Sequence, residues 1–377
     1  MIPALKNWLS RVFNTSILRK NRMQWVDYLR GIAILLVVYR HVLLGLQHAG
    51  IFIQPWLVEA NIMFYSFRMP LFFILSGIFI NGSLKKNGLR KVVFNKFENL
   101  LYPYLVWSVI QITLQILTAR YNNSHRSLID YTYILYQPRA LDQFWYLPAL
   151  FNATFVYLII KTKLKASPWS QLALGIVLYF LSPYCRSISL LSDFMEFYLF
   201  FAIGDAISET FFLAKAQSFF KNIRSLLLML PFFIVAQLYY ISHDPISTPA
   251  FLAIALISCL TMFIFAFQLQ DWKILSFLRV LGYHSLYIYV MHVIIAAVVR
   301  VFFIRVLGIT EPNILLFTGI LLSVTIPVII YNLFIYKKPL WFLFSLKKKE
   351  ERPAPATTIP SAAIPGGSLQ QDKKDRS

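Results

Sequence analysis

Three ionisable side chains lie inside apolar stretches of the sequence, and their chemical types suit acid–base chemistry. The run LRGIAILLVVYRH holds Arg30 near its start and His41 at its end, and the run IMFYSFRMPLFFILSG holds Arg68. A neutral histidine can accept a proton, while an arginine can stabilise a developing oxyanion or hold a phosphate. Because ionisable groups deep in a membrane span are costly, we interpret His41 as a functional residue.

Helical spacing places Asp27, Arg30 and His41 on one stripe. Eleven positions separate Arg30 from His41, which is close to three turns and about 16 Å along a helix. Arg30 is either an interface anchor or a ligand-binding group, and Asp27 is expected to orient it through an ion pair across one turn. Arg40 lies about 100° around the helix from His41, so it either faces elsewhere or helps to bind an anion.

Arg68 is expected to lie near His41. The second apolar run returns through the membrane in the opposite direction, which brings Arg68 to a depth similar to that of His41. A nearby cation keeps an imidazole neutral and able to accept a proton. His41 is therefore the candidate base and Arg68 its cationic partner.

Two further stretches, QFWYLPAL and GYHSLYIYVMH, contain the supporting candidates Trp145, Ser285 and His292. Trp145 is equally well explained as an interfacial aromatic anchor, and His292 as a residue with a structural hydrogen bond. The two cysteines, Cys185 and Cys259, show neither metal-ligand nor redox spacing. We therefore expect no metal site and no bound cofactor.

The elements that must position these residues are membrane helices. The 377 residues are 58% hydrophobic and only 14% charged, which is typical of a polytopic membrane protein. A net charge of +20 would suit a nucleic-acid binder, but the basic residues fall in short clusters between apolar runs rather than in one patch. We predict an all-α bundle of about ten transmembrane helices, near residues 26–47, 61–80, 98–118, 144–161, 170–183, 193–212, 225–242, 248–267, 282–304 and 312–336.

The distribution of Lys and Arg predicts the topology. Alternate loops are rich in basic residues, and this places both termini in the cytoplasm. The segment 119–143, expected outside, is a mild exception because it holds Arg120, Arg126 and Arg139. We predict a basic amphipathic or disordered cytoplasmic leader (1–24), a membrane domain (25–340) and a disordered cytoplasmic tail (341–377).

Four stretches, in order, resemble the acyltransferase-3 family of integral-membrane bacterial O-acyltransferases, over about residues 24–340. They are the Arg-x10-His pair of Arg30 and His41, FRMPLFFILSG, FWYLPALF and LGYHSLYIYVMH. The chain departs from the family at the start of the third span. Many relatives carry an Arg-x-x-Arg pair there, whereas this chain has Lys96 and Asn99.

The resemblance implies a multi-pass protein of the bacterial inner membrane that takes acyl-CoA, often acetyl-CoA, from the cytoplasm. The acyl group would pass to a sugar hydroxyl of an exopolysaccharide or another surface glycan, and polysaccharide assembly proteins are candidate partners. His41 is then the base, and Arg68 stabilises the oxyanion or positions the acceptor. Arg30, with Asp27, holds the donor. The rival route is a covalent acyl intermediate on His41 or Ser76.

Two other classes of function stay open. A transporter or flippase for a lipid-linked glycan or a small solute is also polytopic and carries intramembrane charges. Such folds often show internal repeats, and the sequence shows none. A polysaccharide polymerase usually has a large outer loop, and the longest loop here is the modest segment 119–143.

Overall fold

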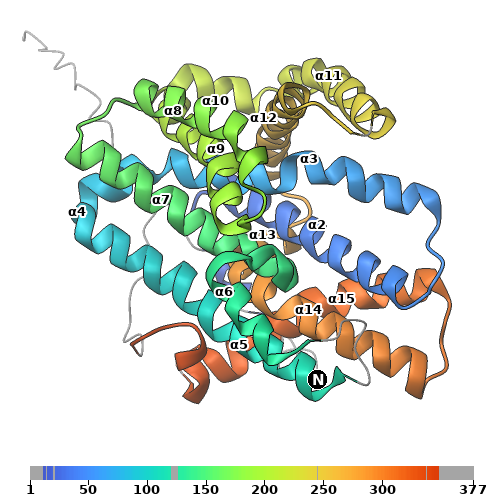
Figure 1. Cartoon of the computed structure of the whole chain (residues 1–377). Helices are drawn as coiled ribbons and strands as arrows, with labels where there is room; N and C mark the ends of the chain where they lie inside the picture. The colour runs from blue at the N-terminus through green and yellow to red at the C-terminus, as the bar shows by residue number, and fades with distance from the viewer. Residues whose placement is uncertain are drawn as a thin grey trace, which may run out of the picture.

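The protein folds as one bundle of helices (Figure 1). The computed structural model describes residues 12–13, 15–19, 22–119, 126–243, 245–336 and 338–347. Most of the predicted leader 1–24 and tail 341–377 lies outside these residues. Within the described part of the chain, every regular element is a helix, which confirms the predicted all-α class.

The α-helices are α2 (Gln24–His48), α3 (Pro55–Ile78), α4 (Ile80–Lys96), α5 (Tyr102–Leu117), α6 (Tyr133–Tyr136), α7 (Tyr146–Lys163), α8 (Pro168–Leu181), α9 (Ser189–Phe211), α10 (Ala214–Lys221), α11 (Ile223–Ser242), α12 (Thr248–Trp272), α13 (Phe277–Tyr283), α14 (Ser285–Val301) and α15 (Pro312–Ile330). Short 3-10 helices are η1 (Thr15–Arg19), η4 (Leu128–Thr132), η5 (Pro138–Trp145), η6 (Ser182–Cys185) and η9 (Pro339–Leu343). Single π-helical turns are η2 (Phe97–Leu101), η7 (Phe302–Val306) and η8 (Tyr331–Ile335).

Each of the ten predicted spans contains a helix, but not all of these helices are long enough to cross a membrane. Eight described helices meet the requirements of length and hydropathy. A ninth span arises only if α9 and α10, which meet at a bend of 106°, are taken together. Helix α8 has 14 residues, fewer than the roughly 20 that a bilayer requires.

The segment between the second and third predicted spans is helical rather than a loop. Helix α4 covers it and continues through the π turn η2 into α5, so that one helical run extends over 38 residues from Ile80 to Leu117. Its basic residues Lys85, Lys86, Arg90 and Lys91 are solvated along this extension. Gly88, with φ of 71°, interrupts the run, because glycine adopts this conformation at little cost.

Helix α2 occupies the middle of the bundle, where it packs against α3, α12, α13, α14 and α15 (Figure 1). Glycines allow the closest of these approaches. A Cβ on Gly31 would lie 2.0 Å from the Leu278 carbonyl oxygen, and a Cβ on Gly282 would lie 1.9 Å from the Asp27 carbonyl oxygen. Small residues of this kind let membrane helices cross backbone to backbone. The α2–α13 crossing therefore fixes the position of the helix that carries His41.

Replacing Gly282 by alanine should destabilise the protein. The added methyl group has no space against the α2 backbone, and overpacking of this kind costs about 1–3 kcal/mol. Gly82→Ala is the matched control, because a Cβ there meets nothing within 4 Å and alanine favours a helix. Thermal unfolding in detergent should show a lower melting temperature for Gly282→Ala only. Equal melting temperatures would contradict the role of this crossing.

Candidate active site

A cavity of about 630 Å³ lies at the end of the bundle where α2 ends. Its size falls in the range typical of small-molecule sites. Exposed residues His48 and Asp142 lie among its lining residues, so the cavity reaches the protein surface at this end. The residues that line it come from five elements: Val37, Arg40, His41, Leu44, Gly45 and His48 of α2; Tyr65, Arg68 and Met69 of α3; Gln115 of α5; Arg139, Asp142, Gln143 and Trp145 of η5; and Tyr289, Val293, Ala296, Ala297 and Arg300 of α14.

His41 lines this cavity, and the supporting candidate His292, which is fully buried and does not line it, contacts His41. Their ring centroids are 5.1 Å apart in an edge-to-face arrangement. The Nδ1 atom of His292 lies 2.8 Å from the Tyr289 carbonyl oxygen and 3.1 Å from that of Ile288. Carbonyl oxygens only accept hydrogen bonds, so Nδ1 carries the proton and Nε2 of a neutral His292 carries the lone pair. This Nε2 atom is buried and has no hydrogen-bond partner in the described structure.

The guanidinium groups of Arg40 and Arg68 both contact the ring of Tyr65. The guanidinium carbon of Arg68 is 5.1 Å from the centroid of Tyr65, and that of Arg40 is 5.5 Å from the same centroid. Arg68 is only 2% exposed, and its Nη1 donates a hydrogen bond of 3.2 Å to the side-chain oxygen of Asn61. The structure therefore brings Arg68 to the cavity of His41, as expected, and settles the position of Arg40, which lines the same cavity.

Arg139 is held at the rim by carboxylates behind it. Its Nε atom donates a hydrogen bond of 2.5 Å to Asp193, and its Nη2 lies 3.9 Å from Glu196. Its guanidinium carbon lies 4.4 Å from the ring centroid of Trp145. Trp145 thus lines the cavity beneath a cation.

The segment 119–143, predicted as a loop, supplies part of the cavity wall. Within its described part it forms η4, α6 and the start of η5, and η5 supplies Arg139, Asp142 and Gln143 to the cavity lining. The side chain of Gln143 donates a hydrogen bond of 2.8 Å to Gln111 of α5, which fastens η5 to the helices. Asp142, at a positive φ of 59°, is the acidic residue among the lining residues, and it pairs with Arg126 at 3.7 Å.

The residues predicted for the donor lie elsewhere. Arg30 and Asp27 are near the other end of α2, and neither lines the cavity. Asp27 forms its ion pair with Arg22, at 3.1 Å, and not with Arg30, so the predicted pairing across one turn is wrong. Asp27 remains a charged neighbour of Arg30, and Tyr146 and Lys96 also lie near Arg30. Ser285, at the start of α14, is also outside the cavity lining.

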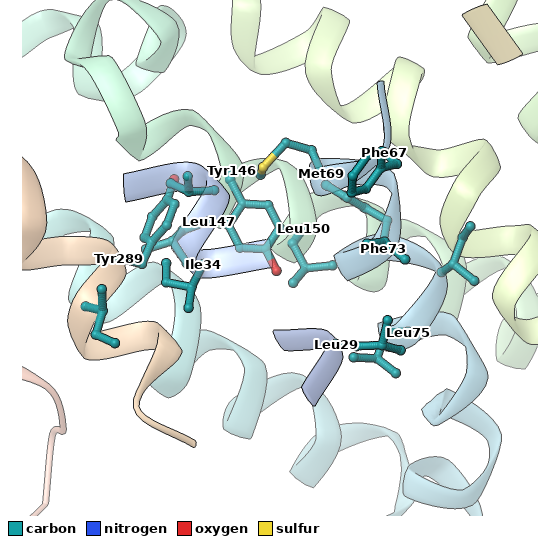
Figure 2. Close-up of a cluster of buried hydrophobic side chains, with 14 of the residues drawn as sticks. Leu29, Ile34, Phe67, Met69, Phe73, Leu75, Tyr146, Leu147, Leu150 and Tyr289 are labelled. Atoms are coloured by element: carbon teal, nitrogen blue, oxygen red, sulfur yellow. The ribbon is translucent and has the colours of Figure 1, made fainter. Parts of the chain in front are cut away.

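Figure 2 shows a cluster of buried aromatic and apolar side chains that includes Tyr146 and Tyr289. Tyr146 of α7 lies near Arg30. Its ring centroid is 5.5 Å from that of Tyr289. The ring of Tyr289 is in turn 6.2 Å from that of His292. Ring contacts therefore link Tyr146 of α7, through Tyr289 and His292 of α14, to His41 of α2.

Several lining residues had not been singled out from the sequence: His48, Tyr65, Asp142 and Arg300. Two signals pointed to the site without identifying it. Arg139 belongs to the segment whose arginines break the topology rule, and Arg300 is a charge inside a predicted span. In the structure, Nη1 of Arg300 donates a hydrogen bond of 2.8 Å to the Gly45 carbonyl oxygen.

Comparisons with known proteins give one family. A model described as "acyltransferase domain" matches residues 23–332. The chain is similar to the nodulation protein NolL of Mesorhizobium japonicum, with 28% identity over 184 residues that cover 49% of this chain and 47% of the relative. It is also similar to the nodulation protein NolL of Sinorhizobium fredii, with 26% identity over 191 residues that cover 50% of each. The chain thus matches about half the length of these curated relatives. No solved structure gives a significant match.

Labelling of introduced cysteines should show which side of the membrane the cavity faces. In a variant without the two native cysteines, Ala297→Cys lies in the cavity and Ser285→Cys lies near the opposite end of α14. The predicted topology puts the cavity outside, so an impermeant thiol reagent added to intact cells should modify the residue introduced at 297 only. An anionic thiol reagent should modify the cysteine at position 297 faster than a cationic one does, because the arginines of the cavity raise the local concentration of anions. Modification at 285 but not at 297 would show that the cavity faces the cytoplasm, and this would contradict the predicted topology.

Proposed function

The chain belongs to the acyltransferase domain family, whose model matches residues 23–332, and on that basis we propose that it transfers an acyl group from cytoplasmic acyl-CoA to a sugar hydroxyl. The family and the apolar helices make it a membrane acyltransferase. The finer proposal is that the donor is acetyl-CoA and that the acceptor belongs to an exopolysaccharide or another surface glycan outside the bacterial inner membrane.

The observation that carries this proposal is the placement of His41. Its ring faces a cavity that reaches the surface, together with the cations Arg40 and Arg68. Transfer to an alcohol requires a base for the hydroxyl proton and a positive group for the oxyanion, and both types of group are present in this cavity. The predicted topology places the cavity on the outer side, where a surface glycan would enter.

The reaction follows from these groups. A nitrogen of His41 takes the proton of the acceptor hydroxyl while its oxygen attacks the thioester carbonyl carbon. The negative charge that develops on the carbonyl oxygen is stabilised by a guanidinium. Arg68 is our candidate, through N–H groups that are not bound to the acceptor. The carbon–sulfur bond then breaks, and the leaving CoA thiolate takes the proton from His41. The products are the ester and free CoA, and His41 returns to its neutral form.

His292 is positioned to assist His41. Because its Nδ1 proton is held by two backbone carbonyl oxygens, the lone pair on its buried Nε2 is fixed in orientation. We propose that this lone pair stabilises the imidazolium of His41 during the reaction. His292 is thus a positioning residue, comparable to the third member of a catalytic triad.

The donor would approach from the opposite end. Arg30 and Lys96 lie at that level, and their charges act on each other, so a pair of cations is available for a phosphate of CoA. Lys96 supplies a charge close to where many relatives have the arginine pair. The pantetheine arm would then pass Tyr146 and Tyr289 to reach His41, which requires these rings to move apart.

Replacing His41 by alanine should abolish acyl transfer without loss of the folded protein. General bases contribute about 10²–10⁴ in rate, so the release of free CoA by protein in nanodiscs should fall by at least the lower of these factors. The assay mixture contains acetyl-CoA and oligosaccharides prepared from the surface glycans of the bacterium that carries this protein. NMR of the surface glycans from a deletion strain complemented with each variant gives the same test in cells.

His243→Ala is the matched control, since His243 is exposed at the end of α11 and lies outside the cavity. Wild-type acylation by His41→Ala would overturn the mechanism. Unchanged glycan acylation in the deletion strain, together with altered polymer export, would favour a transporter.

Replacing Arg30 by alanine should weaken the use of the donor. Loss of a charged hydrogen bond costs about 1.5–3 kcal/mol, so the KM for acetyl-CoA should rise about tenfold or more while the KM for the acceptor changes little. Lys85→Ala, an exposed basic residue on α4, is the control for general electrostatic attraction. If the donor KM stayed unchanged in Arg30→Ala, Arg30 would have no part in donor binding.

A further inference from the structure

The cavity holds more positive charge than the described protein neutralises. Four arginines line it, at positions 40, 68, 139 and 300. The carboxylates that approach it are already paired, since Asp193 binds Arg139 and Asp142 binds Arg126. Among the described residues, no carboxylate lies within ion-pair distance of Arg40, Arg68 or Arg300.

Arg40 and Arg68 are the two cations that remain for a ligand. Arg300 is tied to the Gly45 backbone through Nη1. The recorded side-chain contacts of the Arg68 guanidinium are with Asn61 and Tyr65, and neither of these residues is a carboxylate. Burial of a cation without a counterion is costly. Here the buried Arg68 and the half-buried Arg40 repel each other beside one tyrosine ring. An anion between them would offset both penalties.

The transient oxyanion of acyl transfer does not explain this arrangement by itself. It carries one charge for a short time, whereas two guanidinium groups are present throughout the catalytic cycle. The CoA phosphates do not explain it either, because the proposed donor site at Arg30 lies about 16 Å from the level of His41 along α2. The remaining partner in the proposed reaction is the acceptor.

We propose that Arg40 and Arg68 bind an anionic group of the acceptor, a carboxylate or a phosphate, so that the substrate is an acidic rather than a neutral glycan. This inference rests on the proposed function and specifies its acceptor. Guanidinium groups suit the role because their planar N–H donors match carboxylate and phosphate oxygens in pairs. Both groups contact Tyr65, so they lie near each other in the cavity. The bound anion then places a neighbouring hydroxyl at His41.

Sugar binding, measured directly in the absence of acyl-CoA, tests this inference. Protein in nanodiscs is titrated with glucuronate, glucose 1-phosphate, glucose and CoA, and the dissociation constant of each is measured. Comparison of glucuronate with glucose 1-phosphate shows whether the arginines prefer a carboxylate or a phosphate group. The variants are Arg40→Gln, Arg68→Gln and the charge-retaining Arg40→Lys. Arg186→Gln is the matched control, because it removes an exposed arginine from a segment expected on the same side but outside the cavity.

At least one of the two acidic sugars should bind at least about tenfold more tightly than glucose, since a charged hydrogen bond contributes about 1.5–3 kcal/mol. Arg40→Gln and Arg68→Gln should each remove this preference, Arg40→Lys should retain part of it, and Arg186→Gln should leave it unchanged. The melting temperature of ligand-free Arg40→Gln should equal or exceed that of the wild type, because removal of an uncompensated charge relieves repulsion. A purely structural arginine would show the opposite shift.

Equal affinity for glucose and both acidic sugars would overturn the inference. It would also fail if the preference survived in both glutamine variants, or if CoA were the anion whose binding depended on Arg40. The proposed function is judged separately by acyl transfer. Acylation that requires His41, combined with no preference for acidic sugars, would reject this inference and leave the acyltransferase mechanism standing. His41→Ala should still bind the acidic sugar.

Discussion

The burial of cationic side chains at one end of an apolar bundle is the constraint on which the rest of the structure depends. A guanidinium inside a membrane protein requires hydrogen bonds, a counterion or contact with water. The protein uses a different solution at each site: two carboxylates for Arg139, a backbone carbonyl for Arg300, and a tyrosine ring shared by Arg40 and Arg68. The contact with Tyr65 does not neutralise the charges of Arg40 and Arg68, and these two arginines line the same cavity as His41.

This arrangement needs a central helix with a fixed position. Helix α2 holds its place because its backbone meets that of α13 at Gly31 and Gly282, and α3 meets α9 in the same way at Gly77 and Gly204. Such crossings leave little freedom for the helices to slide. The polar residues at the far end of α2 and α3 are therefore set on a rigid frame, while the segment that closes the cavity, η5, is attached by side-chain hydrogen bonds.

Hydropathy and helical spacing predicted the all-α bundle, and the charges inside apolar runs pointed to His41 and Arg68. Local rules of this kind work because a membrane span is defined by its own residues. The helical form of residues 81–97 was missed because α4 is a polar extension of α5. The partner of Asp27 and the contribution of Arg139 depend on how separate segments pack, which no local pattern records. The arginines that broke the topology rule were nevertheless the sign that segment 119–143 meets the site.

The proposed mechanism requires donor and acceptor to reach His41 from opposite ends of the bundle. Its most direct test is a cryo-electron microscopy structure of the protein with a thioether analogue of acetyl-CoA, which the enzyme cannot cleave. The nucleotide should lie beside Arg30 and Lys96, the pantetheine arm should pass between Tyr146 and Tyr289, and the sulfur atom should lie next to His41. A nucleotide bound among Arg40, Arg68 and Arg139 would contradict it, because donor and acceptor would then enter from the same side.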